Sequence, residues 1–188
     1  MKLIHLPPLA LFVTASLLSA NTLAAPELSK SISSTTSSDM VHVFGWMEDA
    51  CDGEQPPYKK VYDKHAVFIN SIRGQRPYED FVKPKAQWSS EYRNTIKEVK
   101  MNVGDIYTEY RVIFNKGVTY RGQPLEEYIF SFIPESSGGQ NTLKFSSNAN
   151  ISTIMSNFQT RQVEYWGEME DRGAIYNPKN KMVTCEFW

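Results

Sequence analysis

Residues 99–114, VKMNVGDIYTEYRVIF, decide the fold class of this chain. Apolar and polar side chains alternate in two runs, 99–103 and 106–114, which is the pattern of strands with one buried face. Gly104 and Asp105 separate the runs, and both residue types favour turns. The stretch therefore predicts an antiparallel β-hairpin.

Other β-type runs follow the hairpin. They cover 118–120, 128–133, 143–145, 163–169 and 174–188, with turns predicted at 171–173 and 177–180. Most of the chain after residue 99 is thus predicted to be antiparallel sheet.

Helical patterns lie mainly before the hairpin. Apolar residues recur at helical spacing over 40–51, with Asp39 in the N-cap position. Residues 58–69 are compatible with a strand, an extended arm or a helix, and 151–158 have the apolar spacing of a short amphipathic helix. The fold class that follows is α+β, a curved antiparallel sheet packed against an N-terminal helix.

The first 24 residues have the features of a cleaved export signal. A basic residue at position 2 precedes an apolar run over 9–18, which is shorter than the roughly 20 residues needed to span a bilayer. Small residues before Ala25 fit a peptidase site. We expect a Ser/Thr-rich flexible leader over 25–38 and a single domain over 39–188, without an integral membrane segment after cleavage.

Two cysteines, Cys51 and Cys185, are present in the chain. An even number of cysteines in an exported protein predicts one disulfide, because the compartment is oxidising. Cys51 precedes Asp52, whose negative charge would raise the pKa of a thiol, so a catalytic thiolate is a poorer interpretation. We expect the protein to lie in the periplasm or to be secreted.

The charge balance argues against a nucleic-acid partner. Lys and Arg number 20 against 21 for Asp and Glu in 188 residues, so no excess of positive charge exists to attract phosphate. Phosphate-binding glycine motifs are absent from the sequence, and His42 and His65 are too far apart to suggest a metal site. We predict no cofactor and no metal.

Aromatic residues make up 13% of the chain, and some occur among polar residues of the predicted strands. Tyr107, Trp166 and Tyr176 are in such positions, where exposed aromatic side chains are typical of contact surfaces. Glu168 and Glu170 share strand parity with Trp166, which predicts one face carrying all three. We predict these five residues as the partner-binding site.

That parity also predicts that Trp166, Glu168 and Glu170 lie on the face opposite Val163, Tyr165 and Met169. In this interpretation the strand would present one polar, aromatic face to a partner.

Three functional hypotheses follow. The first is an exported, non-enzymatic macromolecule-binding protein with a protein partner, such as a periplasmic inhibitor or immunity protein. The second is an exported hydrolase that uses a carboxylate pair, for which two acidic clusters are candidates. The third is a pilus or adhesin subunit. The candidate acids are Glu48, Asp49 and Asp52 in one cluster and Glu168, Glu170 and Asp171 in the other.

Overall fold

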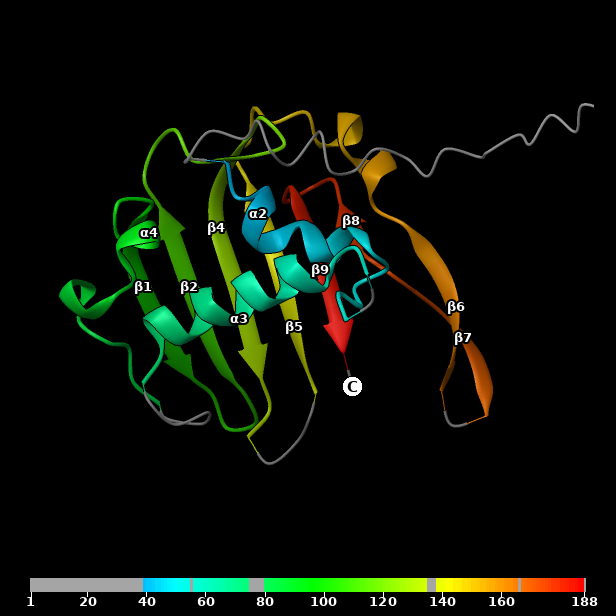
Figure 1. Ribbon diagram of the computed structural model, residues 1–188, viewed down its shortest axis with the longest axis horizontal. Coiled ribbons are helices and arrows are strands. Elements are labelled where there is room, and N and C mark those ends of the chain that lie inside the picture. Colours follow the sequence, from blue (N-terminus) through cyan, green and yellow to red (C-terminus); the bar gives the residue numbers. More distant parts are fainter. Residues whose placement is uncertain (1–38, 55, 75–79, 135–137, 166, 188) are drawn as a thin grey trace, which may run out of the picture.

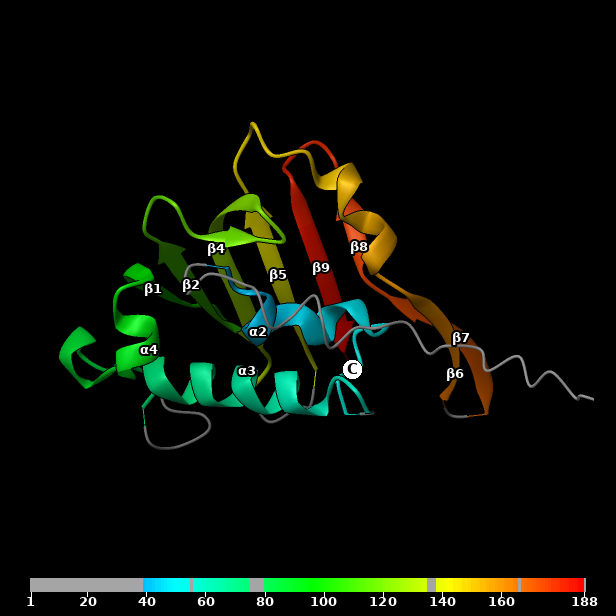
Figure 2. The same ribbon diagram turned by 45° about the horizontal axis from the view of Figure 1, so that its top comes forward.

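The computed structural model describes residues 39–54, 56–74, 80–134, 138–165 and 167–187. Within these residues, seven strands form one antiparallel sheet in the order β1-β2-β4-β5-β9-β8, with the short strand β3 beside β4 (Figure 1). Their bounds are Ile96–Val103 (β1), Thr108–Phe114 (β2), Thr119–Tyr120 (β3), Gln123–Phe132 (β4), Gly139–Phe145 (β5), Ile175–Asn177 (β8) and Met182–Phe187 (β9). Helices from the N-terminal part cover one face (Figure 2), so the predicted α+β class is confirmed.

The hairpin predicted from residues 99–114 is formed by β1 and β2. In β2 every second side chain, beginning with Thr108, is buried, as the alternation predicts. Ile106 differs, because it lies in the turn and is exposed. Gly104 closes this turn by donating its N–H to the carbonyl of Tyr107 at 2.8 Å. The buried face therefore begins one alternation later than predicted.

The principal helix is α3, Lys59–Ile72, which runs obliquely across the sheet (Figure 1). The structure thereby decides between the alternatives for residues 58–69 in favour of a helix. His65, Phe68 and Ile72 recur at helical spacing and are buried against the sheet.

The helix predicted over 40–51 is wrong in extent. α2 covers only Val41–Phe44 and is followed by a 3-10 turn, η1, over Gly45–Glu48. Its β-branched and aromatic residues are weak helix formers, and a glycine interrupts them. Ala50 and Cys51 have φ angles of 50° and 61°, so the chain has left the helix before the cysteine.

Two short elements, η2 (Lys85–Gln87) and α4 (Ser90–Arg93), lie between α3 and β1. They accompany Trp88 and Tyr92, which are buried in the core. No helix in the described part of the chain is long and apolar enough to cross a membrane.

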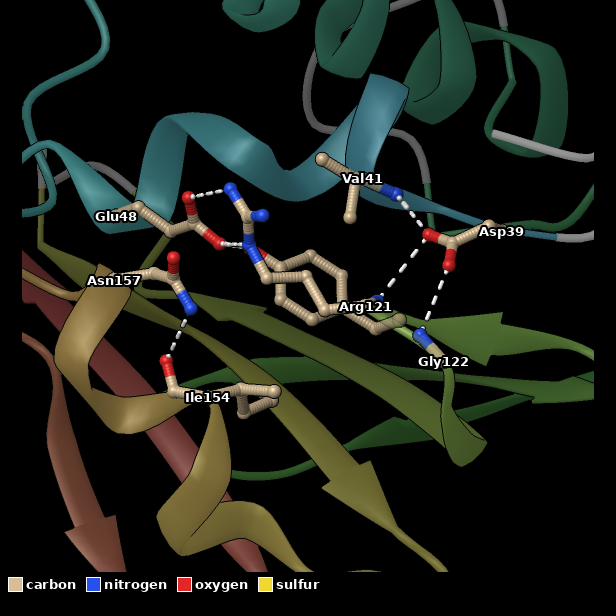
Figure 3. A network of polar contacts seen from close by, with 8 residues as sticks. Asp39, Val41, Glu48, Arg121, Gly122, Ile154 and Asn157 are labelled. Atoms are coloured by element: carbon tan, nitrogen blue, oxygen red, sulfur yellow. Dashed lines mark hydrogen bonds and ion pairs between the residues drawn. The ribbon is translucent and has the colours of Figure 1, made fainter. Parts of the chain in front are cut away.

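A buried ion pair joins the N-terminal segment to the sheet (Figure 3). The carboxylate of Glu48 accepts hydrogen bonds from Arg121 Nε at 2.5 Å and Arg121 Nη2 at 2.7 Å. The hydroxyl of Tyr120 donates a third bond at 2.7 Å. Because an unpaired charge at this depth would be costly, the contact strongly favours one position for the segment.

Asp39 forms a second anchor in the same region. Its carboxylate accepts the backbone N–H groups of Val41 at 3.1 Å, Arg121 at 3.3 Å and Gly122 at 3.1 Å. The hydroxyl of Thr119 donates to it at 3.2 Å. Asp39 therefore binds the start of α2, near its predicted capping position, and also holds the β3–β4 turn (Figure 3).

The predicted disulfide is confirmed. Cys51, in the segment after η1, is bonded to Cys185 in β9, with 5.5 Å between the two Cα atoms. The bond is a third attachment of the N-terminal segment to the sheet, after those of Glu48 and Asp39. A disulfide is consistent with an oxidising compartment.

The helix predicted over 151–158 is replaced by two 3-10 turns, η3 (Ile151–Thr153) and η4 (Met155–Asn157). Ile151 and Ile154 are buried as the spacing predicted, whereas Met155 and Phe158 are only partly buried. The region is rich in side chains that bond locally: Thr153 donates its hydroxyl to the carbonyl of Asn150, and Asn157 donates its amide to that of Ile154 (Figure 3). Such bonds compete with a continuous α-helix.

β6 (Thr160–Tyr165) and β7 (Glu168–Gly173) form a separate two-stranded sheet, which we call the β6–β7 arm. The arm extends away from the main sheet in both views (Figures 1 and 2). The turn predicted at 171–173 is wrong, because those residues belong to β7. Gly167, with a φ of 86°, lies in the connection between the strands instead.

We expect the double variant Cys51→Ala/Cys185→Ala to lose stability. The bond closes a sequence separation of 134 residues, so its removal should lower the free energy of unfolding by up to about 5 kcal/mol. Urea denaturation of the variant and of the oxidised and reduced protein measures this. Equal midpoints for all three samples would contradict the expectation.

Candidate functional site

The structure does not bring the five predicted partner-binding residues together. Tyr107 is exposed in the β1–β2 turn, whereas Glu168 and Glu170 are exposed on the β6–β7 arm, beyond the other side of the main sheet (Figure 1). Tyr176 in β8 is partly buried and packs against the core. Trp166 lies outside the described residues.

The predicted division into faces is confirmed for Met169, which alternates with Glu168 and Glu170 along β7, and is wrong for Val163. Val163 pairs with Glu170, and Glu164 pairs with Met169. Directly paired residues point to the same side of a two-stranded sheet, so Glu170 shares a face with Val163 rather than opposing it. The prediction treated residues 163–169 as one continuous strand with alternating faces. The chain instead turns near Gly167, and this turn breaks the alternation between β6 and β7.

Exposed apolar side chains occur in and beside the β1–β2 hairpin, at one corner of the sheet. We call this group the apolar corner, and it comprises Phe81, Met101, Val103, Ile106 and Tyr107. Val103 pairs with Thr108, whose hydroxyl donates to Asp80 at 3.2 Å, so the segment carrying Phe81 lies beside the hairpin. Ile106 is 70% exposed and Val103 54%, which is unusual for neighbouring apolar residues.

A groove of about 500 Å³ runs between α3 and the sheet; we call it the α3 groove. Tyr62, His65, Ile69 and Arg73 line it from the helix side, and their spacing places them along one face of α3. They extend over 11 residues, or about 16 Å at the rise of an α-helix. The sheet lines the groove with Phe130, Ser131, Phe132, Asn141 and Phe187, and Trp46 of η1 adds a further aromatic side chain.

A chain of buried hydrogen bonds forms part of this groove. Nε2 of His65 lies 2.7 Å from the hydroxyl of Tyr128, which donates to Oδ1 of Asn141. Because the hydroxyl proton is directed to Asn141, His65 must donate through Nε2, which defines its tautomer. The chain joins α3 to β4 and β5.

Burial lowers the pKa of His65 to about 3 from an ordinary value of 6.5. The imidazole is therefore neutral at the pH of any ordinary biological compartment. A neutral, hydrogen-bonded ring of this kind supports a structural role for His65 rather than proton transfer.

Arg73 lies at the other end of the groove, directly after α3. Its guanidinium carbon is 4.4 Å from the ring centre of Phe132 and 5.5 Å from that of Tyr110. Nε and Nη2 are both buried and have no hydrogen-bond partner among the described residues. A buried donor without a partner costs about 1–3 kcal/mol. Nothing in the described fold offsets this cost except the two ring contacts, each worth about 0.5–2 kcal/mol.

The remaining charges of the groove lie at its opposite end. Asp52, Glu54 and Arg172 line this end, near the start of α3. Asp52 accepts a hydrogen bond from Arg161 at 3.1 Å, so its charge is already paired. Arg73 is thus set apart from the other charged residues that line the groove.

The acidic clusters considered for hydrolysis differ in environment. Glu48 is buried and bound to Arg121 and Tyr120, whereas Glu168 and Glu170 are exposed. No group of three or more metal-binding side chains occurs among the residues that the structure describes.

Two parts of this description could not be found from the sequence. Arg73 belongs to no motif, and its unpaired state depends on which groups the fold leaves near it. Ile106 continues the alternation of β2 in sequence, so the pattern predicts burial; only the turn geometry reveals its exposure.

Comparisons with protein-family models, with curated proteins and with solved structures give no match to this chain. The functional argument therefore depends on the geometry of the described residues.

The low pKa of His65 predicts a loss of stability in acid. The unfolded chain binds a proton below pH 6.5, whereas the folded protein does so only near pH 3, so the free energy of unfolding falls progressively between these values. From pH 7 to pH 5 this contribution amounts to about 2 kcal/mol.

Urea denaturation at several pH values measures this loss. In His65→Gln the free energy of unfolding should fall less between pH 7 and pH 5, by about the 2 kcal/mol given above. His42→Gln, which leaves His65 in place, is the matched control. Identical pH dependence in the protein and in His65→Gln would contradict the assignment.

Proposed function

We propose that this protein is an exported, non-enzymatic binding protein that recognises another protein, in the manner of a periplasmic inhibitor or immunity protein. The observation that supports this most is the apolar corner. Monomeric proteins seldom expose neighbouring large apolar side chains unless they form a contact surface. Tyr107, a predicted partner-binding residue, belongs to the corner.

The composition of the corner suits a protein partner. Aromatic residues and methionine are enriched in the centres of protein interfaces, and charged residues are depleted there. Phe81, Met101 and Tyr107 provide such side chains, while Val103 and Ile106 add apolar area that burial would remove from water. A partner that covers the corner would therefore gain most of its binding energy from apolar contact.

The β6–β7 arm supports a second area of contact. Glu168 and Glu170 are exposed on it, and charges at the rim of an interface mainly accelerate association. The predicted anchor Trp166 remains a prediction. The arm would then assist, rather than carry, the recognition that the corner provides.

The state of the acidic and histidine side chains supports binding over hydrolysis. Glu48 is bound to Arg121, and His65 is neutral and bound to Tyr128, so the ion pair and the hydrogen bond hold both in the fold. An exported hydrolase and a pilus or adhesin subunit remain the weaker hypotheses, since no contact described above favours either.

Site-specific cross-linking tests the proposal. A photoreactive benzoylphenylalanine placed at position 106 in the organism that makes the protein should yield one main cross-linked partner. The matched control is position 175, since Ile175 is 58% exposed on the edge strand β8, at the other side of the sheet.

An untagged Ile106→Asp variant should fail to compete for the partner, whereas Ile175→Asp should compete fully, because a charge at the corner disrupts an apolar contact. The proposal is overturned if positions 106 and 175 give the same products, or if Ile106→Asp competes as well as the unaltered protein.

A further inference from the structure

We infer that the α3 groove is a binding site for the carboxylate of an organic acid with an elongated apolar body, and that Arg73 binds the carboxylate. This goes beyond recognition of a protein at the apolar corner, and it does not depend on that recognition.

The unpaired atoms of Arg73 point to a planar, two-oxygen anion. Nε and Nη2 lie on the same edge of a guanidinium group, and their N–H bonds run parallel, which matches the two oxygens of one carboxylate. On Arg73 this edge is buried and without a partner among the described residues.

Two other arginines of this chain show which group the Nε–Nη2 edge binds. Arg121 uses Nε and Nη2 to donate to the two carboxylate oxygens of Glu48. Arg111 directs the same two nitrogens to the carboxylate of Glu127. Arg73 presents the equivalent edge without its carboxylate.

The position of Arg73 is well defined before any ligand binds. Its backbone N–H donates to the carbonyl of Ile69 at 3.0 Å, which ends α3, and its guanidinium lies over the ring of Phe132. A donor held in this way loses little conformational freedom on binding, so more of the interaction energy appears as affinity.

The remaining surface of the groove indicates what the carboxylate is attached to. Trp46, Phe130, Phe132 and Phe187 supply aromatic surface to the groove, and the helix face is about 16 Å long from Tyr62 to Arg73. The indole N–H of Trp46 is also buried without a partner. An elongated apolar molecule with its carboxylate at Arg73 would lie along this wall, and a polar atom near its far end could accept from Trp46.

The charges favour a carboxylate over a phosphate. A phosphate dianion is usually held by several cations or N–H groups, whereas Arg73 is alone at its end of the groove. The other charged lining residues, Asp52, Glu54 and Arg172, are at the opposite end and include two acids. The carboxylate could belong to a free organic acid or to the C-terminus of a peptide chain, since both have the same chemistry.

Calorimetric titration of the disulfide-bonded protein tests the inference. 4-Phenylbutyrate should bind with a stoichiometry of one, and 4-phenylbutyramide, which lacks the charge, should bind roughly tenfold more weakly or not at all. Arg73→Met should abolish binding of the acid, and Arg73→Lys should weaken it by about tenfold or more, because an ammonium group cannot form the parallel pair of bonds. Arg111→Met, which alters an arginine that is bound to Glu127 and does not line the groove, is the matched control and should bind as the unaltered protein does.

Denaturation of the same variants separates binding from folding. Because Arg73→Met removes buried donors that lack partners, its urea midpoint should equal or exceed that of the unaltered protein. Loss of binding together with a lower midpoint would assign Arg73 to the fold and overturn the inference.

Two further probes distinguish the source and the class of the ligand. N-acetyl-Phe-Phe as the free acid, compared with its C-terminal amide, indicates a peptide terminus if the acid binds at least as tightly as 4-phenylbutyrate, and a free organic acid if it does not. Tighter binding of phenylphosphate, absence of binding by every acid, or loss of binding in Arg111→Met but not in Arg73→Met would each overturn the carboxylate site. None of these results would alter the cross-linking expected at position 106.

Discussion

The buried pairing of Glu48 with Arg121 and Tyr120 is the contact on which the arrangement of the domain depends. It joins the segment before α3 to the turn between β3 and β4, and it supplies hydrogen bonds to a carboxylate that is buried from water. Trp46 precedes Glu48 by two residues and Cys51 follows it by three. The pairing therefore also positions one wall of the α3 groove and the N-terminal half of the disulfide.

Two arginines of this fold differ in whether the Nε–Nη2 edge of the guanidinium group is bound to a carboxylate. Arg121 has both nitrogens of one edge bound to a carboxylate, whereas the equivalent edge of Arg73 is buried and has no hydrogen-bond partner among the described residues. Stability alone would favour filling that edge or replacing the side chain by an apolar one. Buried polar groups that lower stability in this way are expected at sites where a protein binds a ligand.

Sequence periodicity predicted the parts of the fold in which one face of a strand is buried. β2 follows the predicted alternation, whereas in β1 Met101 and Val103 are exposed; the export argument predicted the bond between Cys51 and Cys185. Helical spacing was less informative. Over 40–51 the apolar residues are buried, but a glycine and β-branched residues leave only a short helix, and the main helix lies over 59–72.

The candidate sites could be predicted only in part, because they depend on how elements meet. Tyr107 was found from its polar neighbours, but its grouping with Phe81 requires the contact between residues 80 and 108. The faces of the β6–β7 arm depend on the place of one turn. The lack of a hydrogen-bond partner for Nε and Nη2 of Arg73 among the described residues depends on how several elements meet, which no local pattern can show.

The most direct test of the account is the side-chain N–H resonance of Arg73 Nε in ¹⁵N-edited NMR spectra, with Arg121 Nε as an internal reference that is already bound to a carboxylate. The account predicts that, in the protein alone, the Arg73 resonance lies away from the Arg121 position, and that saturating 4-phenylbutyrate moves it towards that position while Arg121 is unchanged. An Arg73 resonance that is already at the Arg121 position without ligand, or that does not move when 4-phenylbutyrate is added, would contradict the account.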